Sequence, residues 1–254
     1  FDGETWHYLT TQRLADREVN ALAEDHDGAI WLATTGGVSR CDGDEWTVYT
    51  ERDGLADNDS RAVIVDGAGN VWVGGGSGKF EGEALSRFDG ERWIPYTLAG
   101  DMVYANVAAL AVDPDGIPWA VAWNPQQFTA GSALFRFDGE QWQAIPGPNP
   151  LADDRVYAFA IDKAGRMWFG TDGSYGSPTL LTFDGQEWSQ VRIDEANSSV
   201  RAIAFADAES GYLGTNDGLA QFRMADDGAV TITWDPTRRE IPVQAIAVEQ
   251  MGGE

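Results

Sequence analysis

The sequence predicts an all-β protein, a β-propeller made of four-stranded antiparallel blades, and three observations carry this prediction. An apolar run of the form V-x-A recurs along the chain, Asp/Gly turns follow it, and tryptophans return at matching places in successive repeats. Helical periodicity is absent throughout. A meander of four short strands with apolar residues on both faces is stable only when similar sheets cover it, and radial stacking of such sheets gives a propeller.

The V-x-A run, or a close variant, is the expected first strand of each repeat. An Asp/Gly turn then leads into a second strand, a third strand usually ends at Cys-Asp-Gly or Phe-Asp-Gly, and a fourth carries another tryptophan. Asp-Gly between apolar runs is a hairpin signal. The first strands are expected at 19–24, 60–65, 107–112, 156–161, 200–205 and 243–248, and complete blades at 19–50, 60–97, 107–146, 156–191 and 200–234.

Ten of the eleven tryptophans fit this repeat. A tryptophan that recurs at a fixed place indicates packing between blades rather than a ligand cage. The eleventh, Trp123, stands in AVAWNPQQFTAGS (120–132), a stretch that nothing else in the chain resembles. The second-strand tryptophans are Trp31, Trp72, Trp119 and Trp168, with Tyr212 in the fifth repeat, and the fourth-strand tryptophans are Trp6, Trp46, Trp93, Trp142, Trp188 and Trp234.

The segment DGAIWLATTGGVSRCDGDEWTVYTERDGLADNDSRAVIVDGAGNVWVGG closely resembles the two-component regulator propeller repeat. The match is strong over 19–97, good over 156–191 and looser over 107–146, and FRMADDG replaces the Phe-Asp-Gly motif within 200–234. The resemblance implies a sensor-domain propeller of a bacterial regulator, often a histidine kinase that detects carbohydrate fragments, in the periplasm or outside the cell. Because the repeat residues are structural, the resemblance implies a fold more directly than a ligand.

Residues 1–254 are predicted to form a single propeller domain, most simply six-bladed, with seven blades as the alternative. The closing blade would be a composite of 241–254 and 1–10, and it lacks its second strand and most of its third. An open blade leaves strand edges unpaired. We therefore expect further residues, further blades or a partner chain to complete it.

Charge and composition exclude several function classes. The chain carries 41 acidic and 17 basic residues, a formal charge of −24, which opposes binding to nucleic acid or an anionic membrane surface. No apolar run approaches the roughly 20 residues of a membrane helix. The only histidines, His7 and His26, do not cluster with other ligands, so we predict no catalytic residue and no metal or other cofactor. Calcium stays open at the turns EDHDG and DPDG, although their spacing is that of turns rather than of an EF-hand.

Variation in length is concentrated at one end of the predicted strands. The connections between second and third strands expand at 74–84, 122–132 and 171–179, whereas the hairpin turns at the other end are short and uniform. Variable loops on a rigid scaffold commonly carry function, so we expect the ligand at this loop-rich face. The variable residue of V-x-A should lie at the same face, near the mouth of a central funnel, and its occupants are Asn20, Arg61, Ala108, Tyr157, Arg201 and Gln244.

These patterns predict a non-catalytic sensor or recognition module that binds a small polar ligand such as an oligosaccharide. Arginine forks also suit a carboxylate or phosphate, unless each arginine pairs with a neighbouring aspartate. A protein-interaction scaffold is one alternative, and a lyase or hydrolase that uses Tyr157 and the funnel arginines is another. A downstream signalling domain would be a further partner. The predicted stacking residues are Trp123, Phe128 and Tyr175, and the predicted polar contacts are Asn20, Arg61, Tyr157, Arg201 and Gln244.

Overall fold

The computed structural model describes most of the chain, and nearly all of its regular structure is β-strand. The described residues are 13–76, 83–98, 105–124, 132–146, 150–151, 155–173, 179–191, 193, 199–225, 228–239 and 242–246. Within these ranges there are 20 strands and one short 3₁₀ helix, η1 (Glu51–Asp53). Over the same ranges, no helix has the length and apolar character needed to cross a bilayer.

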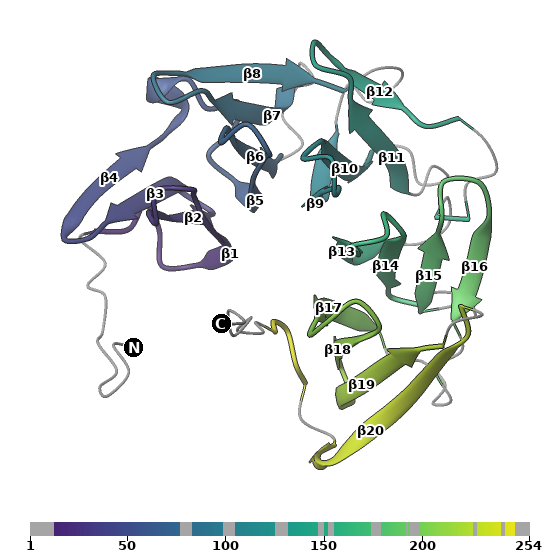
Figure 1. Ribbon diagram of the computed structural model, residues 1–254. Helices are drawn as coiled ribbons and strands as arrows, with labels where there is room; N and C mark the ends of the chain where they lie inside the picture. Colours follow the sequence, from purple (N-terminus) through teal and green to yellow (C-terminus); the bar gives the residue numbers. More distant parts are fainter. Residues whose placement is uncertain are drawn as a thin grey trace. The chain divides into compact units, whose positions relative to one another are not determined.

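The strands form five four-stranded sheets in which strands consecutive in sequence are neighbours (Figure 1). The first sheet contains β1 (Val19–Glu24), β2 (Ile30–Thr34), β3 (Gly37–Asp42) and β4 (Glu45–Tyr49), and the second contains β5 (Ser60–Val65), β6 (Val71–Gly75), β7 (Glu83–Phe88) and β8 (Trp93–Thr97). The third contains β9 (Asn106–Val112), β10 (Pro118–Trp123), β11 (Ser132–Phe137) and β12 (Trp142–Ala144). The fourth contains β13 (Val156–Ile161), β14 (Met167–Thr171), β15 (Leu180–Phe183) and β16 (Trp188–Val191), and the fifth contains β17 (Val200–Phe205), β18 (Ser210–Thr215), β19 (Gly218–Met224) and β20 (Val230–Arg239). The prediction of an all-β chain of four-stranded antiparallel sheets is confirmed.

The chain divides into two compact units, one within 1–107 and 138–143 and the other within 108–137 and 144–254, referred to below as unit 1 and unit 2. The core of unit 1 gathers around Trp31, Val63 and Trp93. Unit 2 has one core cluster around Phe159 and Phe169, whose rings stack with centroids 4.9 Å apart, and another around Trp168 and Phe222. That residues 1–254 form a single domain stays a prediction.

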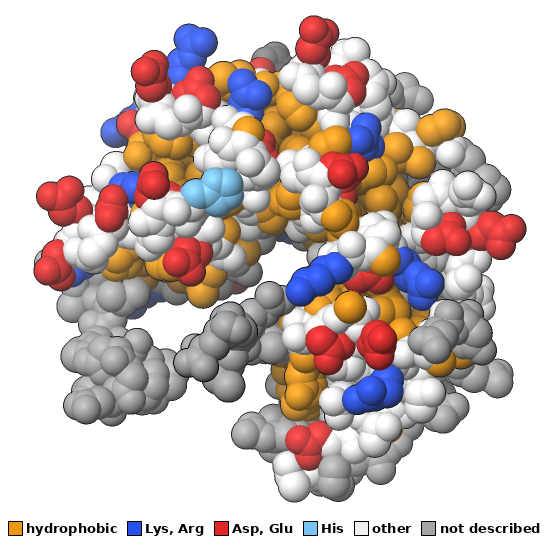
Figure 2. Space-filling model, viewed as in Figure 1, with side chains coloured by type: hydrophobic (Ala, Val, Ile, Leu, Met, Phe, Trp, Pro, Cys, Tyr) orange, Lys and Arg blue, Asp and Glu red, His pale blue; other side chains and the backbone are white. Residues whose placement is uncertain are grey.

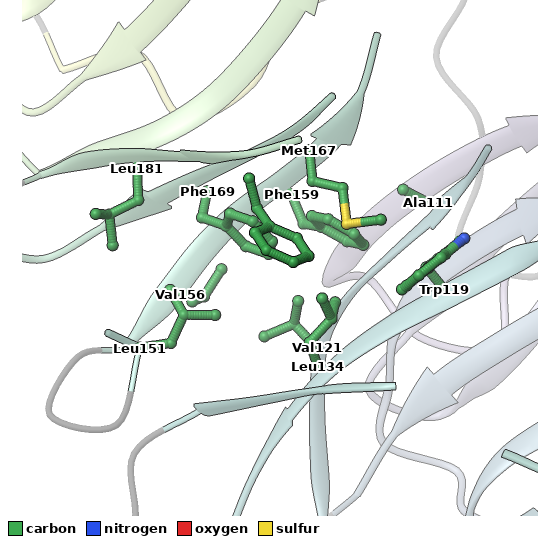
Figure 3. Packing of buried hydrophobic residues seen from close by; sticks show 11 residues of the cluster. Ala111, Trp119, Val121, Leu134, Leu151, Val156, Phe159, Met167, Phe169 and Leu181 are labelled. Carbon is green, nitrogen blue, oxygen red and sulfur yellow. The ribbon is translucent and has the colours of Figure 1, made fainter. Parts of the chain in front are cut away.

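The core clusters consist of side chains from neighbouring sheets. In Figure 3, Val121 and Leu134 of the third sheet face Phe159 and Phe169 of the fourth. Trp119 contributes an apolar ring to the same cluster. A single sheet of this kind cannot bury both of its faces, so each depends on the next for its core, as the sequence pattern predicts.

One aspartate anchors the first hairpin in four of the five sheets, and Asp66 shows the arrangement. Its Oδ1 accepts hydrogen bonds from the backbone N–H groups of Ala68 and Asn70, both at 2.9 Å, and its Oδ2 accepts one from Trp72 Nε1 at 2.7 Å. One carboxylate therefore closes the turn and also satisfies the only polar group of a buried indole. The equivalent pairs are Asp25–Trp31, Asp113–Trp119 and Asp162–Trp168.

Arginine covers the outer ring face of three of these tryptophans. Arg40, Arg87 and Arg136 are the β-ladder partners of Trp31, Trp72 and Trp119, and each guanidinium carbon lies 5.6–5.7 Å from its ring centroid. Thr182 and Gln221 take this place in the fourth and fifth sheets. These three arginines therefore belong to the scaffold.

The chain beyond the fifth sheet differs in part from the sequence prediction. β20 continues to Arg239, past the predicted limit at 234, and 242–246 form no strand where one was expected to begin at 243. The Val243 N–H nevertheless donates to the Thr215 carbonyl at 2.9 Å, so the chain returns to the end of β18. Residues 1–12 and 247–254 lie outside the described residues, and the choice between six and seven blades stays a prediction.

Removing the Asp66 carboxylate should destabilise unit 1. In Asp66→Ala, the N–H of a fully buried indole and two turn N–H groups lose their acceptor, and we expect the free energy of unfolding to fall by about 2–4 kcal/mol. Urea unfolding followed by circular dichroism measures the change. Asp89→Ala is the matched control, because that exposed carboxylate accepts hydrogen bonds from backbone N–H groups of a turn and none from an indole, with one long ion-pair contact to Arg92 at 3.8 Å. Equal losses for the two variants would contradict an anchoring role for Asp66.

Acid should weaken the hairpins between third and fourth strands. Backbone N–H groups two and three residues ahead hold the pKa of Asp89, Asp138 and Asp184 below its usual range. A lowered folded-state pKa adds stability that is complete above the unfolded value, near pH 4, and is lost as the pH falls through the folded value. The urea midpoint should therefore drop on acidification below about pH 4. The triple Asp→Asn variant, whose amides keep the turn acceptor without titrating, should show a shallower drop.

Candidate functional site at the bulged first strands

The variable residue of V-x-A lies in a β-bulge. In the fourth sheet Val156 pairs with Thr171 and Ala158 pairs with Gly170, so the intervening Tyr157 is an extra residue in the ladder. The same register shift occurs in three further sheets. A bulge turns its extra side chain away from the regular alternation of the strand, and bulges are frequent beside functional sites. The bulged residues are Asn20, Arg61, Tyr157 and Arg201.

In unit 1 the bulged side chains connect neighbouring sheets. Asn20 Nδ2 donates to the Ser60 carbonyl at 2.8 Å. Arg61 Nη2 lies 2.8 Å from Asp59 Oδ2, and Arg61 Nη1 donates to Asn106 Oδ1 at 3.3 Å. These donors are thus used inside the fold, and a ligand role for Asn20 and Arg61 stays a prediction.

In unit 2 two arginines lie over two aromatic rings. The Arg201 guanidinium carbon is 3.7 Å from the centroid of the Tyr157 ring, and Arg201 Nε donates to Asn216 Oδ1 at 3.3 Å. The Arg155 guanidinium carbon is 5.3 Å from the centroid of Trp123. Trp123 ends β10, Arg155 directly precedes β13, and Tyr157 and Arg201 are the second residues of β13 and β17. We call these four residues the arginine–aromatic site.

The two arginines of this site keep an uncompensated charge within the described part of the chain. There, ion pairs with carboxylates involve Arg40, Arg61 and Arg92, and neither Arg155 nor Arg201 has a carboxylate oxygen within 4.0 Å. Acidic side chains are spread over the face shown in Figure 2 rather than gathered in one patch. A guanidinium over an aromatic ring keeps its in-plane N–H groups available for hydrogen bonds. The site therefore combines two aromatic rings with guanidinium groups that can donate hydrogen bonds.

The other predicted site residues are placed as follows. Gln244 is exposed in 242–246, and Phe128 and Tyr175 lie outside the described residues. In unit 2, Trp123 is in contact with Arg155 and Tyr157 with Arg201, and a ligand role for these residues stays a prediction. The Trp123 ring is not an open stacking surface, because Arg155 lies against it and the side chain is half-buried. Arg155 was not among the predicted site residues. Its position two residues before Tyr157 is the feature of the sequence that could have indicated it.

Two hollows lie at the hairpin turns, the end of the strands opposite to the one where the sequence predicts the ligand. A groove of about 540 Å³ in unit 1 is lined by His26, Arg40, Tyr49 and Phe88 among others, and one of about 370 Å³ in unit 2 is lined by Arg166, Asp184 and Glu187 among others. Each opens between the turns and strands of two sheets, which explains why short turns do not close it. These hollows are alternative places for a ligand.

Few of the described side chains could bind a metal ion or act as a histidine base. They include one histidine, His26, in the β1–β2 turn, and no group of three or more His, Cys, Asp or Glu side chains that could hold a metal ion. In the two calcium-like turns, the Asp25 and Asp113 carboxylates accept hydrogen bonds from backbone and indole N–H groups. The turn function of these aspartates accounts for the motif.

Solved structures of β-propellers resemble the chain. The extracellular domain of a hybrid two-component system from B. thetaiotaomicron aligns with a TM-score of 0.67 and 18% identity, over 93% of this chain and 31% of that one. Virginiamycin B lyase from Staphylococcus aureus aligns with a TM-score of 0.70 and 14% identity, over 93% of this chain and 76% of the lyase. A gluconolactonase from Xanthomonas campestris aligns with a TM-score of 0.56 and 15% identity, over 85% and 72% of the two chains. Such low identities establish the fold alone, and the protein is a β-propeller.

Two stretches of the chain also match the sequence pattern of a known repeat family. The sequence pattern of the two-component regulator propeller matches residues 13–36 and 150–173, and the resemblance seen in the sequence is confirmed over these two stretches. No curated protein matches the chain in sequence. The chain spans about a third of the extracellular domain from B. thetaiotaomicron to which it is similar.

The contact between Arg201 and Tyr157 should be measurable in a double-mutant cycle. Arg201→Ala, Tyr157→Leu and the double variant should give a coupling of about 0.5–2 kcal/mol in the free energy of unfolding, as expected for a guanidinium over a ring. Chemical denaturation provides the three values. Arg155→Ala combined with Tyr157→Leu is the reference pair, because Arg155 lies over a different ring. A coupling near zero for Arg201 and Tyr157 would contradict the stacked geometry.

Proposed function

We propose that the protein is a non-catalytic recognition propeller, the ligand-binding part of a regulator of the two-component type. It binds a small polar ligand, such as an oligosaccharide, at the arginine–aromatic site. The observation that carries the proposal is that four residues which the repeat does not require form two guanidinium–aromatic contacts in unit 2, Arg155 over Trp123 and Arg201 over Tyr157.

The chemistry of the site supports a sugar-like ligand. The arginine N–H groups, the Tyr157 hydroxyl and the Asn216 amide supply hydrogen-bond partners for the hydroxyl groups of a sugar. The similarity to extracellular domains of two-component systems supports a periplasmic or extracellular location. Ligand binding would act on a signalling domain through the packing between that domain and the propeller.

A lyase or hydrolase is the second candidate, and a specific observation favours it. Tyr157 and Arg201, the pair that such chemistry would use, are in contact, and a lyase and a lactonase are among the similar propellers. In this reading the phenol would exchange a proton with the substrate while the guanidinium stabilises developing negative charge. Product formation, followed by mass spectrometry on any ligand that binds, separates the two functions.

A thermal-shift screen against oligosaccharides tests the proposal. A ligand that binds only the folded state raises the midpoint of unfolding. For each oligosaccharide that raises it, Trp123→Ala combined with Arg201→Ala should reduce the affinity by at least about 100-fold in calorimetry, because the ring that supports Arg155 and the main donor are both removed.

His26→Ala is the matched control for this experiment. His26 lines the groove of unit 1 at the hairpin turns, and its loss should leave the affinity unchanged. An unchanged affinity in the Trp123/Arg201 double variant would reject the arginine–aromatic site. If His26→Ala weakened binding instead, the ligand would belong to the groove of unit 1.

A further inference from the structure

Two arginines at equivalent bulges have different electrostatic partners. Arg61 follows Ser60 and precedes Ala62 in β5, as Arg201 follows Val200 and precedes Ala202 in β17, and both are the extra residue of their ladder. Arg61 is neutralised by Asp59, two positions earlier, at 2.8 Å. The residue two positions before Arg201 is Ser199. The carboxylate that neutralises the first guanidinium is therefore replaced by a hydroxyl beside the second.

Ser199 does not replace the missing acceptor. Its side chain is almost fully buried, and its Oγ donates to the backbone carbonyl of Asp172 at 3.2 Å. The Asp172 carboxylate forms no ion pair with Arg201 within 4.0 Å. Within the described residues, Arg201 contacts the Tyr157 ring and the Asn216 amide oxygen, and it binds the amide through Nε. In the described part of the chain, no protein acceptor bonds to Nη1 or Nη2.

The stacked geometry prepares these two nitrogens for an anion. The guanidinium carbon lies 3.7 Å from the centroid of the Tyr157 ring, and Nε donates to Asn216 Oδ1 at 3.3 Å, so two contacts restrain the guanidinium. A fixed planar fork matches the two oxygens of a carboxylate, phosphate or sulfate group, and little side-chain entropy remains to be lost on binding. Arg155 adds a second guanidinium to the same site.

We propose that Arg201 binds an oxyanion group of the ligand and that Ser199 in place of aspartate makes this possible. The inference rests on the proposed function, because it names the chemical class of ligand for the same site. A carboxylate, as in an acidic sugar, and a phosphate or sulfate ester share the required chemistry. An entirely neutral ligand would leave the Nη1 and Nη2 groups without a charged partner.

Side-chain NMR of arginine tests the proposal directly. In ¹⁵N-labelled protein the Arg201 Nε–H signal is assigned by its disappearance in Arg201→Lys. We expect trigalacturonate to shift it, whereas neutral trigalactose at the same concentration shifts it less. Inorganic phosphate and sulfate, titrated separately, show which oxyanion is preferred. The Arg61 Nε–H signal serves as an internal control and should not move, since Asp59 already occupies that guanidinium.

Exchanging Ser199 and Asp59, the residues two positions before Arg201 and Arg61, gives a matched pair of variants. Ser199→Asp should recreate the Asp59–Arg61 pair around Arg201 and weaken binding of the preferred anion by about tenfold or more, since the new carboxylate competes with it. Asp59→Ser should make the Arg61 signal respond to the same anion. Should Ser199→Asp fail to fold, Arg201→Gln, which keeps a planar side chain without charge, should show the same loss of affinity.

The outcomes separate this inference from the proposed function. If no anion shifts the Arg201 signal, or if Ser199→Asp and Arg201→Gln both bind the anion as tightly as the unmodified protein, the oxyanion site is rejected. A neutral oligosaccharide that still depends on Trp123 would then leave the proposed function standing. If anions shift Arg201 and no oligosaccharide binds, the oxyanion site stands and the proposed sugar ligand fails.

Discussion

The aspartate of the first hairpin is the constraint on which four of the five sheets depend. A buried indole needs a partner for its N–H group, and a tight turn needs an acceptor for its inward N–H groups. One carboxylate supplies both, as Asp162 does for Arg166 N and for Trp168 Nε1. The turn and the inter-sheet core are thereby fixed by the same atoms. The fifth sheet supports this view, since its aspartate and its tryptophan are absent together: Ala206 and Tyr212 occupy those places.

The fifth sheet also shows how the turn survives that loss. Asp207, one position later, accepts hydrogen bonds from Glu209 N and Ser210 N through Oδ1 and from Ser210 Oγ through Oδ2. The partner of Oδ2 is now a hydroxyl of the turn rather than an indole of the core. Turn closure and core anchoring are therefore separable tasks, and four sheets combine them in one residue.

Anchoring at the hairpin end leaves the opposite strand end free to vary. The bulge at V-x-A moves one side chain out of the ladder, so its identity is not fixed by packing. Asn20 and Arg61 use that freedom to connect sheets, whereas Tyr157 and Arg201 contact each other and leave donors available. The same backbone position thus serves cohesion in unit 1 and a candidate binding site in unit 2.

The sequence was sufficient to predict the sheets, because tryptophan spacing and Asp-Gly turns are local signals of packing and chain reversal. It also identified Trp123, Tyr157 and Arg201, since these depart from the repeat. It could not show the bulges, which depend on register between strands, or the contact of Arg155 with Trp123, which joins two sheets. The contrast between Asp59 and Ser199 is visible in the aligned repeats, but its meaning depends on the 2.8 Å contact between Asp59 and Arg61.

The charge of the whole chain and the charge of the site act over different distances. A formal charge of −24 repels an anion at long range, but at physiological ionic strength this repulsion is screened beyond about 8 Å. Hydrogen bonds from a guanidinium act at contact, where screening is weak. An arginine without a carboxylate partner can thus hold an anionic group that lies directly against it, although the chain as a whole is acidic. Selectivity then follows from the geometry of the fork rather than from the sign of the overall field.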